Sequence, residues 1–513
     1  MSNHGRFSRR FVLRSLAVTG AAFAVPLIAA CGAATPTPAP PKPAAPAATA
    51  VPAKPVEAPK PAAPVAAATT APAPAAPATK PAEAAKPATP ATKPAEVAKP
   101  AAPAAAPAIK EVQSGTFNVW FSANWNVVTD KAIGDVFVEW GKGAGVNVEW
   151  QSVPGAPSFL QKIAATVAAG QPPEICNADR TFWYERGEMP AVDDLVNKFK
   201  GQAGGMFDLA IESQRARDGK LNGVPYAVDC WPVHWRTDRI GEVTGGRYFN
   251  SWDELITLGP KIQKPPKDFL LAFALGHEGD HVNNIVNILW DYGGRLNNEE
   301  GVPDIANKEN AAGIETIKKM WDAKLIAPET FAQTVTSWNN ETYQKSRGLM
   351  AINPATIMGW LLVNDKELAD KTGLQPTPKG SKGAFSEGAG IGFNYFKKSK
   401  MVDKAPASLE YFVSPARLEK ISKSVEGRFV PVYRDHAKGD FWEKSKFAEM
   451  KRIAEVGRIR NWPAPSQGWL SDVTDSKYTL SDMMNKILND KMPIPEAQAW
   501  AQGQMMDSYN KFK

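Results

Sequence analysis

The pattern of apolar and polar positions after residue 115 predicts strands that alternate with helices. Every second position of 117–121 is apolar, which is typical of a strand with one buried face. A helix that Thr129 caps is expected next, because apolar residues then recur at helical spacing until Gly143 or Gly145. A second strand follows at 146–150. Strand, helix and strand within so short a segment predict a parallel unit with a right-handed crossover.

The same alternation continues along the chain. Ser158 is expected to open a helix that Gly170 stops, and 174–176 follows as a short strand. Ser251 is placed to cap a further helix, and the last segment, from Ser481, has helical periodicity. These elements predict an α/β fold. About 400 residues of this kind exceed what one hydrophobic core covers, so we expect two lobes.

Residues 1–31 predict an export signal. Arg9 and Arg10 precede an uncharged apolar stretch that ends in Leu27-Ile28-Ala29-Ala30-Cys31. The paired arginines resemble the twin-arginine signal, with an ordinary secretion leader as the alternative, and the end of the stretch resembles a lipobox. Lipidation of Cys31 would anchor the protein on the outer face of the cell membrane.

Residues 32–112 are nearly all Ala, Pro, Thr and Lys, which predicts a disordered linker that extends from the anchor. The first 110 residues carry four Arg and eight Lys against three Glu, whereas the whole chain has a net charge of +7. The remaining residues are therefore slightly acidic. This distribution argues against a nucleic-acid partner.

The cysteines are too few for a disulfide framework and lack the spacing of zinc ligands. Cys31 has its own role, and twin-arginine export moves proteins that are already folded. We therefore expect Cys176 and Cys230 to remain thiols, as in a reducing compartment.

Polar and aromatic side chains follow the predicted strands, where ligands bind in open α/β sheets. Asn124 and Trp125 follow the first strand, Asn177 and Asp179 follow the third, and Asp229 and Trp231 follow residue 226. Amides and carboxylates can hold hydroxyl groups, and an indole can stack on a sugar. The alternatives are that the tryptophans fill cores and that Asp179 and Asp229 cap helices or pair with arginines.

Several short stretches, in order along the chain, resemble family 1 extracellular solute-binding proteins, the maltose-binding-protein-like group. The stretches that carry the resemblance are 168–175 (AAGQPPEI), 221–226 (LNGVPY), 251–255 (SWDEL), 290–294 (WDYGG), 348–352 (GLMAI) and 495–498 (PEAQ).

The resemblance implies a two-lobed periplasmic-binding-protein-like fold of type II, with a hinge between the lobes. We expect lobe I to comprise 113–232 and 385–432, and lobe II to comprise 233–384 and 433–513. The implied function is capture of a small solute, most often a sugar, for the permease subunits of an ABC importer. The protein would act as a monomer, without a cofactor and without catalysis.

The family's ligand contacts can be carried over to matching positions. The loop of Asn124 and Trp125 resembles its first ligand loop, and Gly388 resembles a glycine turn that faces the ligand. Trp469 resembles an aromatic wall, with Trp462 as a weaker match. The full set of expected ligand-binding residues is Asn124, Trp125, Asn177, Asp179, Asp229, Trp231, His277, Gly388 and Trp469.

One motif favours a different function. Residues 277–281 match HExxH, in which two histidines on one helical face bind zinc and the Glu activates water. Glu299 or Glu300 lies where some such enzymes have a third ligand. However, Gly279 opposes a helix, and Asp280 is typical of a helix N-cap, so the histidines would straddle a helix start. We therefore expect no metal, place His277 at the rim of the cleft, and keep a zinc metallopeptidase as the alternative.

Overall fold

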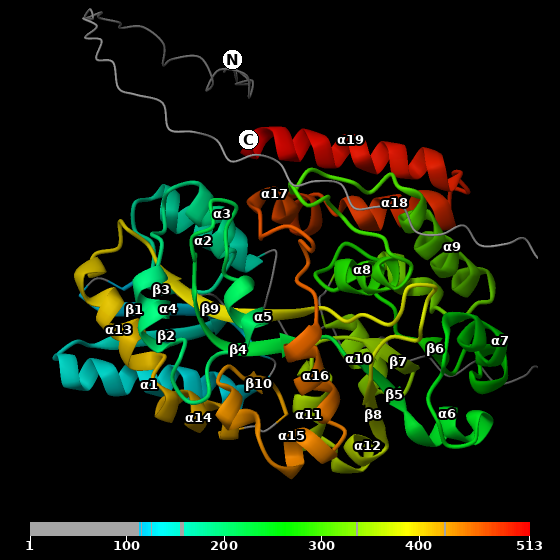
Figure 1. Ribbon diagram of the computed structural model, residues 1–513, viewed down its shortest axis with the longest axis horizontal. Helices are drawn as coiled ribbons and strands as arrows, with labels where there is room; N and C mark the ends of the chain where they lie inside the picture. The colour runs from blue at the N-terminus through cyan, green and yellow to red at the C-terminus, as the bar shows by residue number, and fades with distance from the viewer. Residues whose placement is uncertain (1–111, 114, 125, 154–157, 335–336, 425–426) are drawn as a thin grey trace, which may run out of the picture. The chain divides into compact units, whose positions relative to one another are not determined.

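Two β-sheets organise the protein. The computed structural model describes residues 112–513 except 114, 125, 154–157, 335–336 and 425–426. The predicted signal peptide, most of the linker, Cys31 and Trp125 lie outside the described residues. We call the part around the first sheet lobe I and the part around the second lobe II (Figure 1).

The sheet of lobe I has six strands in the order β10-β4-β9-β3-β1-β2. β1 pairs with β2 and β3 in parallel, as the predicted crossover unit requires, whereas β9 runs antiparallel to β3 and β4, and β10 runs antiparallel to β4. The strands are β1 (Phe117–Ser122), β2 (Val148–Val153), β3 (Ile175–Cys176), β4 (Val224–Cys230), β9 (Gly388–Tyr395) and β10 (Val430–Pro431).

The sheet of lobe II has four strands in the order β6-β7-β5-β8. β6 and β7 are parallel, and β5 runs antiparallel to both of its neighbours. The strands are β5 (Val233–Arg236), β6 (Phe269–Leu271), β7 (Gly348–Ile352) and β8 (Thr372–Gln375).

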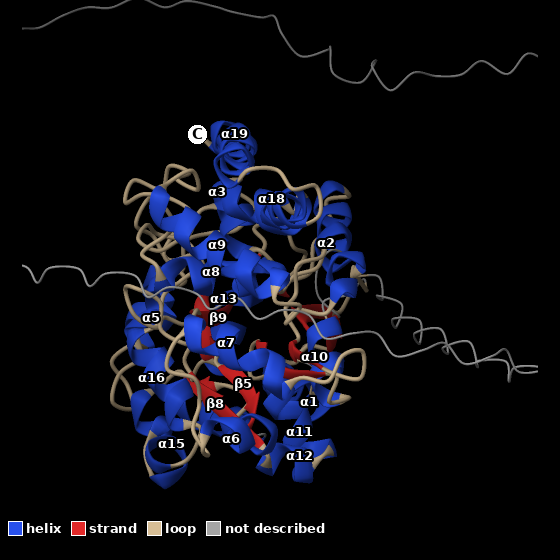
Figure 2. Cartoon of the chain, turned by 90° about the vertical axis from the view of Figure 1, so that its right-hand side faces the viewer, coloured by secondary structure: helices blue, strands red, loops and turns tan. Residues whose placement is uncertain are grey.

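Helices surround the strands of both sheets (Figure 2). Those associated with lobe I are α1 (Val127–Ala144), α2 (Ser158–Ala168), α3 (Arg180–Glu185), α4 (Asp193–Phe199), α5 (Asp208–Glu212), α13 (Ala405–Phe412), α14 (Pro415–Ser424), α15 (Asp440–Lys444) and α16 (Ala448–Val456). Those associated with lobe II are α6 (Thr237–Thr244), α7 (Trp252–Ile262), α8 (His281–Asp291), α9 (Lys308–Asp322), α10 (Trp338–Gln344), α11 (Thr356–Asn364), α12 (Lys366–Asp370), α17 (Gly468–Ser471), α18 (Thr479–Leu488) and α19 (Ile494–Phe512).

Helix starts test the capping predictions. Ser251 accepts a hydrogen bond from the amide of Glu254, so its predicted cap is confirmed. The expected cap at Thr129 is wrong, because α1 begins at Val127 and the side chain of Asn126 accepts from the amides of residues 128 and 129. Val127 is 83% exposed, so this extra turn contributes little to the apolar pattern that marks the helix. Gly145 ends α1 in the left-handed region, as predicted.

The chain crosses between the lobes three times within the described residues. Residues 231–232 join β4 to β5, residues 376–387 join β8 to β9, and residues 457–467 lead from α16 to α17. Buried side chains between Tyr433 and Ala454 belong to a core cluster drawn mostly from lobe I, which also holds Ala351 and Leu374 of the second sheet. The assignment of 433–513 to lobe II and the other lobe boundaries remain predictions.

Cys176 and Cys230 are both buried free thiols, as expected for a protein without a disulfide framework. Burial raises the pKa of the Cys176 thiol to about 12. Both side chains therefore act as small apolar groups of the core.

Candidate functional site

A cavity of about 220 Å³ lies between the lobes, where the three crossings meet. Lobe I contributes Arg180, Ser213 and Gly390, and lobe II contributes Ser471 and Thr474. The crossing segments contribute Trp231, Glu387, Arg460, Asn461 and Gln467. The cavity is smaller than the ~300–1,000 Å³ of pockets for drug-sized ligands. It suits a small solute.

Glu387 joins the three crossings beside this cavity. Its backbone carbonyl accepts a hydrogen bond of 3.0 Å from the amide of Trp231. Its carboxylate accepts from Nε of Arg460 at 3.3 Å and from Nδ2 of Asn283 at 2.8 Å. Burial raises the pKa of Glu387, and the charge of Arg460 opposes that rise. One residue thus joins all three segments at the cavity wall, through its backbone carbonyl and its carboxylate.

Two donors on the cavity wall have no acceptor. The indole Nε1 of Trp231 and the amide Nδ2 of Asn461 find no hydrogen-bond partner among the residues that the structure describes. Asn461 is only 6% exposed, so water outside the cavity does not readily satisfy it. Buried donors are nearly always paired in folded proteins, so these two donors, on residues that line the cavity, are exceptions.

The loop after β3 reaches across to lobe II. Asp179 has a φ of 43°, in the left-handed region that Asp tolerates better than most residues. Its Oδ1 accepts a hydrogen bond of 2.9 Å from Oγ of Ser471 in α17. Burial raises the pKa of Asp179 to about 7, and the nearby charge of Asp475 adds to the effect. This contact is one of the direct polar links between the lobes.

Asn177 acts within lobe I. Its Oδ1 accepts a hydrogen bond of 2.9 Å from the amide of Ser122, which ties the end of β3 to the end of β1. Its carbonyl accepts a bond of 3.0 Å from Arg180, whose other terminal nitrogen donates to Gln214 at 2.7 Å. Asn177 therefore positions Arg180, which lines the cavity.

Asn124 and Asp229 come together at a different place, around Arg428. Its guanidinium donates to the two carboxylate oxygens of Asp229 at 2.9 and 3.3 Å, and to the carbonyl of Asn124 at 3.0 Å. Side chains of the pair are only 4% and 9% exposed. Both oxygens of Asp229 are thus engaged by an arginine, and neither Asn124 nor Asp229 is among the residues that line the cavity. The sequence contains no local signal for Arg428.

Gly388 and Trp469 also lie away from the cavity. Gly388 pairs with Cys230, and a Cβ there would meet Leu209 and Ile453. Trp469 is buried in the core of lobe II, and its Nε1 donates to Oε1 of Gln467 at 2.9 Å. Trp469 therefore orients a residue that lines the cavity and does not line it itself.

Residues 457–476 supply much of the cavity wall, and sequence reasoning missed them. Arg460, Asn461, Ser466, Gln467, Ser471 and Thr474 all come from this stretch. The only available signal was a polar stretch that follows an amphipathic helix, which is a weak indication of a crossing segment.

The HExxH motif does not form a helical face. Helix α8 begins at His281, and residues 277–280 precede it in a loop, which confirms that the histidines straddle a helix start. His277 bonds to Asp482 at 2.7 Å and stacks on Tyr478, half exposed and outside the cavity lining. His281 is fully buried, and burial lowers its pKa to about 4.

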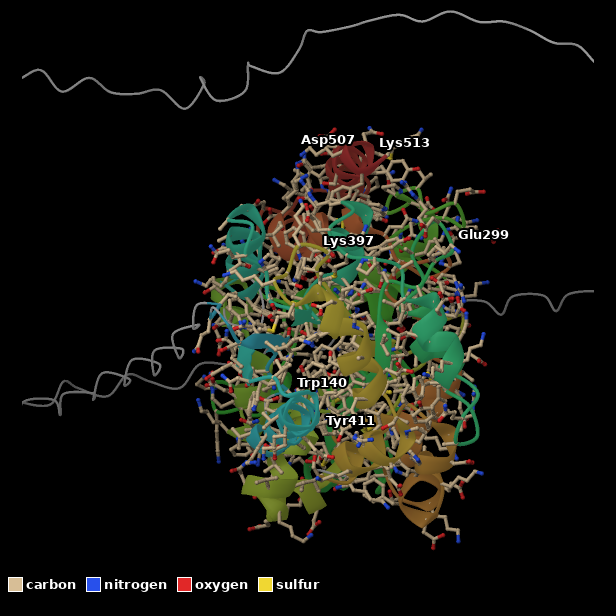
Figure 3. The ribbon with its side chains drawn as sticks, turned by 90° about the vertical axis from the view of Figure 1, so that its left-hand side faces the viewer. Trp140, Glu299, Lys397, Tyr411, Asp507 and Lys513 are labelled. Atoms are coloured by element: carbon tan, nitrogen blue, oxygen red, sulfur yellow. The ribbon has the colours of Figure 1, made fainter. Side chains whose placement is uncertain are left out.

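Metal-binding geometry is missing around this motif. Within the part of the chain that is described, no group of three or more His, Cys, Asp or Glu side chains is placed to hold a metal ion. Glu299, which could have supplied a third ligand, is exposed at the edge of the molecule (Figure 3).

A family model decides what kind of protein this is. Residues 136–449, more than half of the chain, match the model described as bacterial extracellular solute-binding protein. The chain belongs to this family. The family implies that this solute-binding protein works outside the cytoplasm, and none of its described helices has the length and apolarity that a membrane span needs.

Solved structures show the same fold. An ABC transporter solute-binding protein of Thermotoga lettingae, bound with α-D-tagatose, has a TM-score of 0.67 and 16% identity over 77% of this chain and 100% of its own. A sugar transporter of Arthrobacter chlorophenolicus with laminaribiose has a TM-score of 0.65 and 15% identity over 77% and 99%. A solute-binding protein of Agrobacterium radiobacter in complex with ribitol has a TM-score of 0.64 and 14% identity over 78% and 100%. The predicted two-lobed α/β fold is thereby confirmed.

The buried ion pair of Asp229 and Arg428 predicts a large effect on stability. Asp229→Asn leaves the guanidinium buried without its counter-charge, which lowers the free energy of unfolding by roughly 3–5 kcal/mol. Asp135→Asn, which breaks the exposed pair with Lys131, should change it by less than ~1 kcal/mol. Chemical denaturation of both variants measures the difference, and equal effects would contradict the structural role of the buried pair.

Substitution of Asp179 by Asn should stabilise the folded protein, and the gain should depend on pH. Because its folded pKa lies above the unfolded value, the folded state binds the extra proton between about pH 4 and pH 7, and the free energy of unfolding falls as pH rises through that window. Asp179→Asn removes this loss and can still accept from Ser471. We expect its melting temperature to exceed that of the wild type by roughly 1–3 °C at about pH 8 and to match it at about pH 4. A gain that is the same at both pH values would argue against titration of Asp179.

Proposed function

We propose that this protein is the solute-binding component of an ABC importer and that it holds a sugar or another polyhydroxyl compound in the cavity between its lobes. The solute would be released unchanged to the permease subunits. The single observation that carries the proposal is the position of the cavity, which both lobes and all three crossings line. A solute there touches both lobes at once, so its binding energy favours the closed arrangement.

The chemistry of the cavity supports a polyhydroxyl solute. Trp231 offers an indole for stacking and an unpaired N–H, and Asn461 offers an unpaired amide N–H. The tagatose, laminaribiose and ribitol found in similar structures are compounds of this class.

We also propose that the protein is not an enzyme. The HExxH motif is its one recognisable catalytic pattern, and the loop at 277–280 separates the two histidines from a common helical face. Zinc peptidases need both imidazoles on one metal ion.

The predicted lipid anchor completes the proposal. A diacylglycerol on Cys31 would hold the protein, as a monomer, on the outer face of the membrane, with the Ala- and Pro-rich linker as a spacer. The acidic balance after residue 110 supports a partner other than nucleic acid.

A ligand panel tests the proposed function. Sugars and polyols should raise the melting temperature, because a ligand that binds only the folded state stabilises it by mass action. X-ray scattering should show a smaller radius of gyration with the same compounds. Stabilisation only by peptides or inorganic ions would overturn the proposal.

Substitution of Trp231 tests the cavity directly. Trp231→Ala should weaken the binding of the best panel ligand roughly tenfold or more, because it removes both the stacking surface and a donor. Trp231→Phe should recover part of the loss, since it keeps the ring. Trp500→Phe on α19 is the matched control and should leave the affinity unchanged. Calorimetric titration of the three variants measures these effects.

Metal analysis distinguishes a solute-binding protein from a zinc metallopeptidase. The purified protein should contain well under one zinc per chain, and His281→Ala should leave ligand affinity within about twofold of the wild type. Stoichiometric zinc, or peptide hydrolysis that His281→Ala abolishes, would instead establish the metallopeptidase.

A further inference from the structure

Helix α8 carries a buried polar face, which consists of Asn283, Asn287 and Asp291. Successive members lie one helical turn apart, so they share one side of the helix. Each is 1% exposed or less, and none of the three lines the cavity. Elsewhere α8 packs in the core of lobe II, through residues such as Ile285 and Leu289. Polar side chains that are buried in this way need hydrogen-bond partners.

The α8 polar face finds its partners in the second crossing. Asp291 accepts a hydrogen bond of 2.8 Å from the amide of Phe385. Asn287 accepts one of 2.7 Å from the amide of Glu387, and Asn283 donates to the carboxylate of Glu387 at 2.8 Å. Amides two residues apart point to the same side of an extended chain. The end of the second crossing therefore lies along α8 and is bonded to each of its last three turns.

The next residue of the chain belongs to lobe I. β9 begins at Gly388, which pairs with Cys230 at the end of β4. The amide of Trp231, which follows β4, donates to the carbonyl of Glu387 at 3.0 Å. The first and second crossings therefore leave the sheet of lobe I side by side. Glu387, which α8 holds, and Gly388, which β4 holds, are adjacent in the chain.

The third crossing passes the same point. Arg458 forms a parallel bridge with Glu387, through hydrogen bonds of 3.1 and 3.0 Å to the residues on either side of it. Farther along, Arg460 donates to Oδ1 of Asn283 at 3.2 Å. All three crossings thus meet beside Glu387, and α8 is an element of lobe II that holds that point.

We infer that the α8 polar face positions the hinge for solute capture. It holds the second crossing on lobe II as far as Glu387, so that the lobes rotate where Glu387 meets Gly388 and at residues 231–232. The inference rests on the proposed function, in which the lobes close on a solute. Hinges are typically a few residues at the ends of secondary-structure elements, as these are. Because Trp231 and Glu387 line the cavity, the α8 polar face sets the position of its wall without lining it.

Hydrogen exchange of the full-length protein without added solute tests the inference. Residue-resolved mass spectrometry compares the amides of Phe385 and Glu387 with that of Ser381, which is exposed in the same crossing. If α8 holds the crossing while the lobes open, both amides should exchange about 100-fold or more slowly than the amide of Ser381. Exchange as fast as at Ser381 would show that the crossing leaves α8, and would overturn the inference.

Two buried asparagines give a matched pair of variants. Asn287→Ala removes the acceptor of the Glu387 amide. It should raise the exchange of the Trp231 amide about tenfold relative to that of β1, because Trp231 bonds to the residue that is released. Asn394→Ala is the control, since Asn394 is also fully buried and donates to two carbonyls of lobe I at 2.9 Å each. This control should leave the same ratio within about twofold of the wild type.

The variants also have outcomes that contradict the inference. An increase at Glu387 alone in Asn287→Ala would show a local role without effect on the other crossings. Equal increases at Trp231 in both variants would show a general loss of stability. Either result would overturn the inference. Thermal unfolding checks that each variant is folded, and the wild-type measurement does not depend on them.

Solute binding is the functional measurement. Calorimetric titration with ribitol, α-D-tagatose and laminaribiose compares the wild type with both variants. Asn287→Ala should weaken about tenfold the binding of each compound that the wild type binds, and Asn394→Ala should change it by less than about twofold. Equal affinities of Asn287→Ala and the wild type would overturn the inference. No binding of the three compounds to the wild type would count against the proposed solute class, whereas the exchange measurements, which need no solute, would still decide the inference.

Discussion

The carboxylate of Glu387 is the interaction on which the arrangement at the centre of this protein depends. It is 2% exposed, and a charge at such a position is costly unless it is paired and hydrogen-bonded. The partners are Arg460 and Asn283, and the backbone of the same residue bonds to Trp231 and Asn287. The carboxylate thus joins the second and third crossings and α8, and the backbone of the same residue adds the first crossing. Polar residues supply much of the cavity wall around that point.

Much of the fold could be predicted because its signals are local. The spacing of apolar residues after residue 115 located β1, α1 and β2, and Ser251 and Asp280 marked two helix starts, although the side chain of Asp280 makes no capping hydrogen bond. The position of the third crossing could not be predicted in this way. Helix α16 has an apolar face, but amphipathicity does not say which of two sheets that face contacts. Its residues Met450, Ile453 and Ala454 belong to a core cluster drawn mostly from lobe I, which the sequence alone does not indicate.

The candidate site could be predicted only in part, for the same reason. Asn177, Asp179 and Trp231 follow strands, and the rule that ligands bind at strand ends brings them to or near the cavity wall. Asp229 satisfies the same rule, yet its partner Arg428 lies 199 residues away and no periodic pattern connects them. The HExxH motif is the opposite case, in which a sequence pattern is present but the structure does not form the corresponding site. Five residues match a zinc site in sequence, but the chemistry needs a helix through all of them, and a glycine and a helix cap in the middle prevent it.

Ionised carboxylates around the cavity lower the free energy of unfolding of the protein. Burial, with smaller contributions from neighbouring carboxylates, raises the pKa values of Asp179 and Asp280 to about 7, so both carboxylates are harder to ionise in the folded protein than in the unfolded chain. Apolar or amide side chains of similar size at these positions would avoid this cost. Groups that destabilise a fold and lie beside a cavity indicate that binding, rather than folding, determines the residues found there.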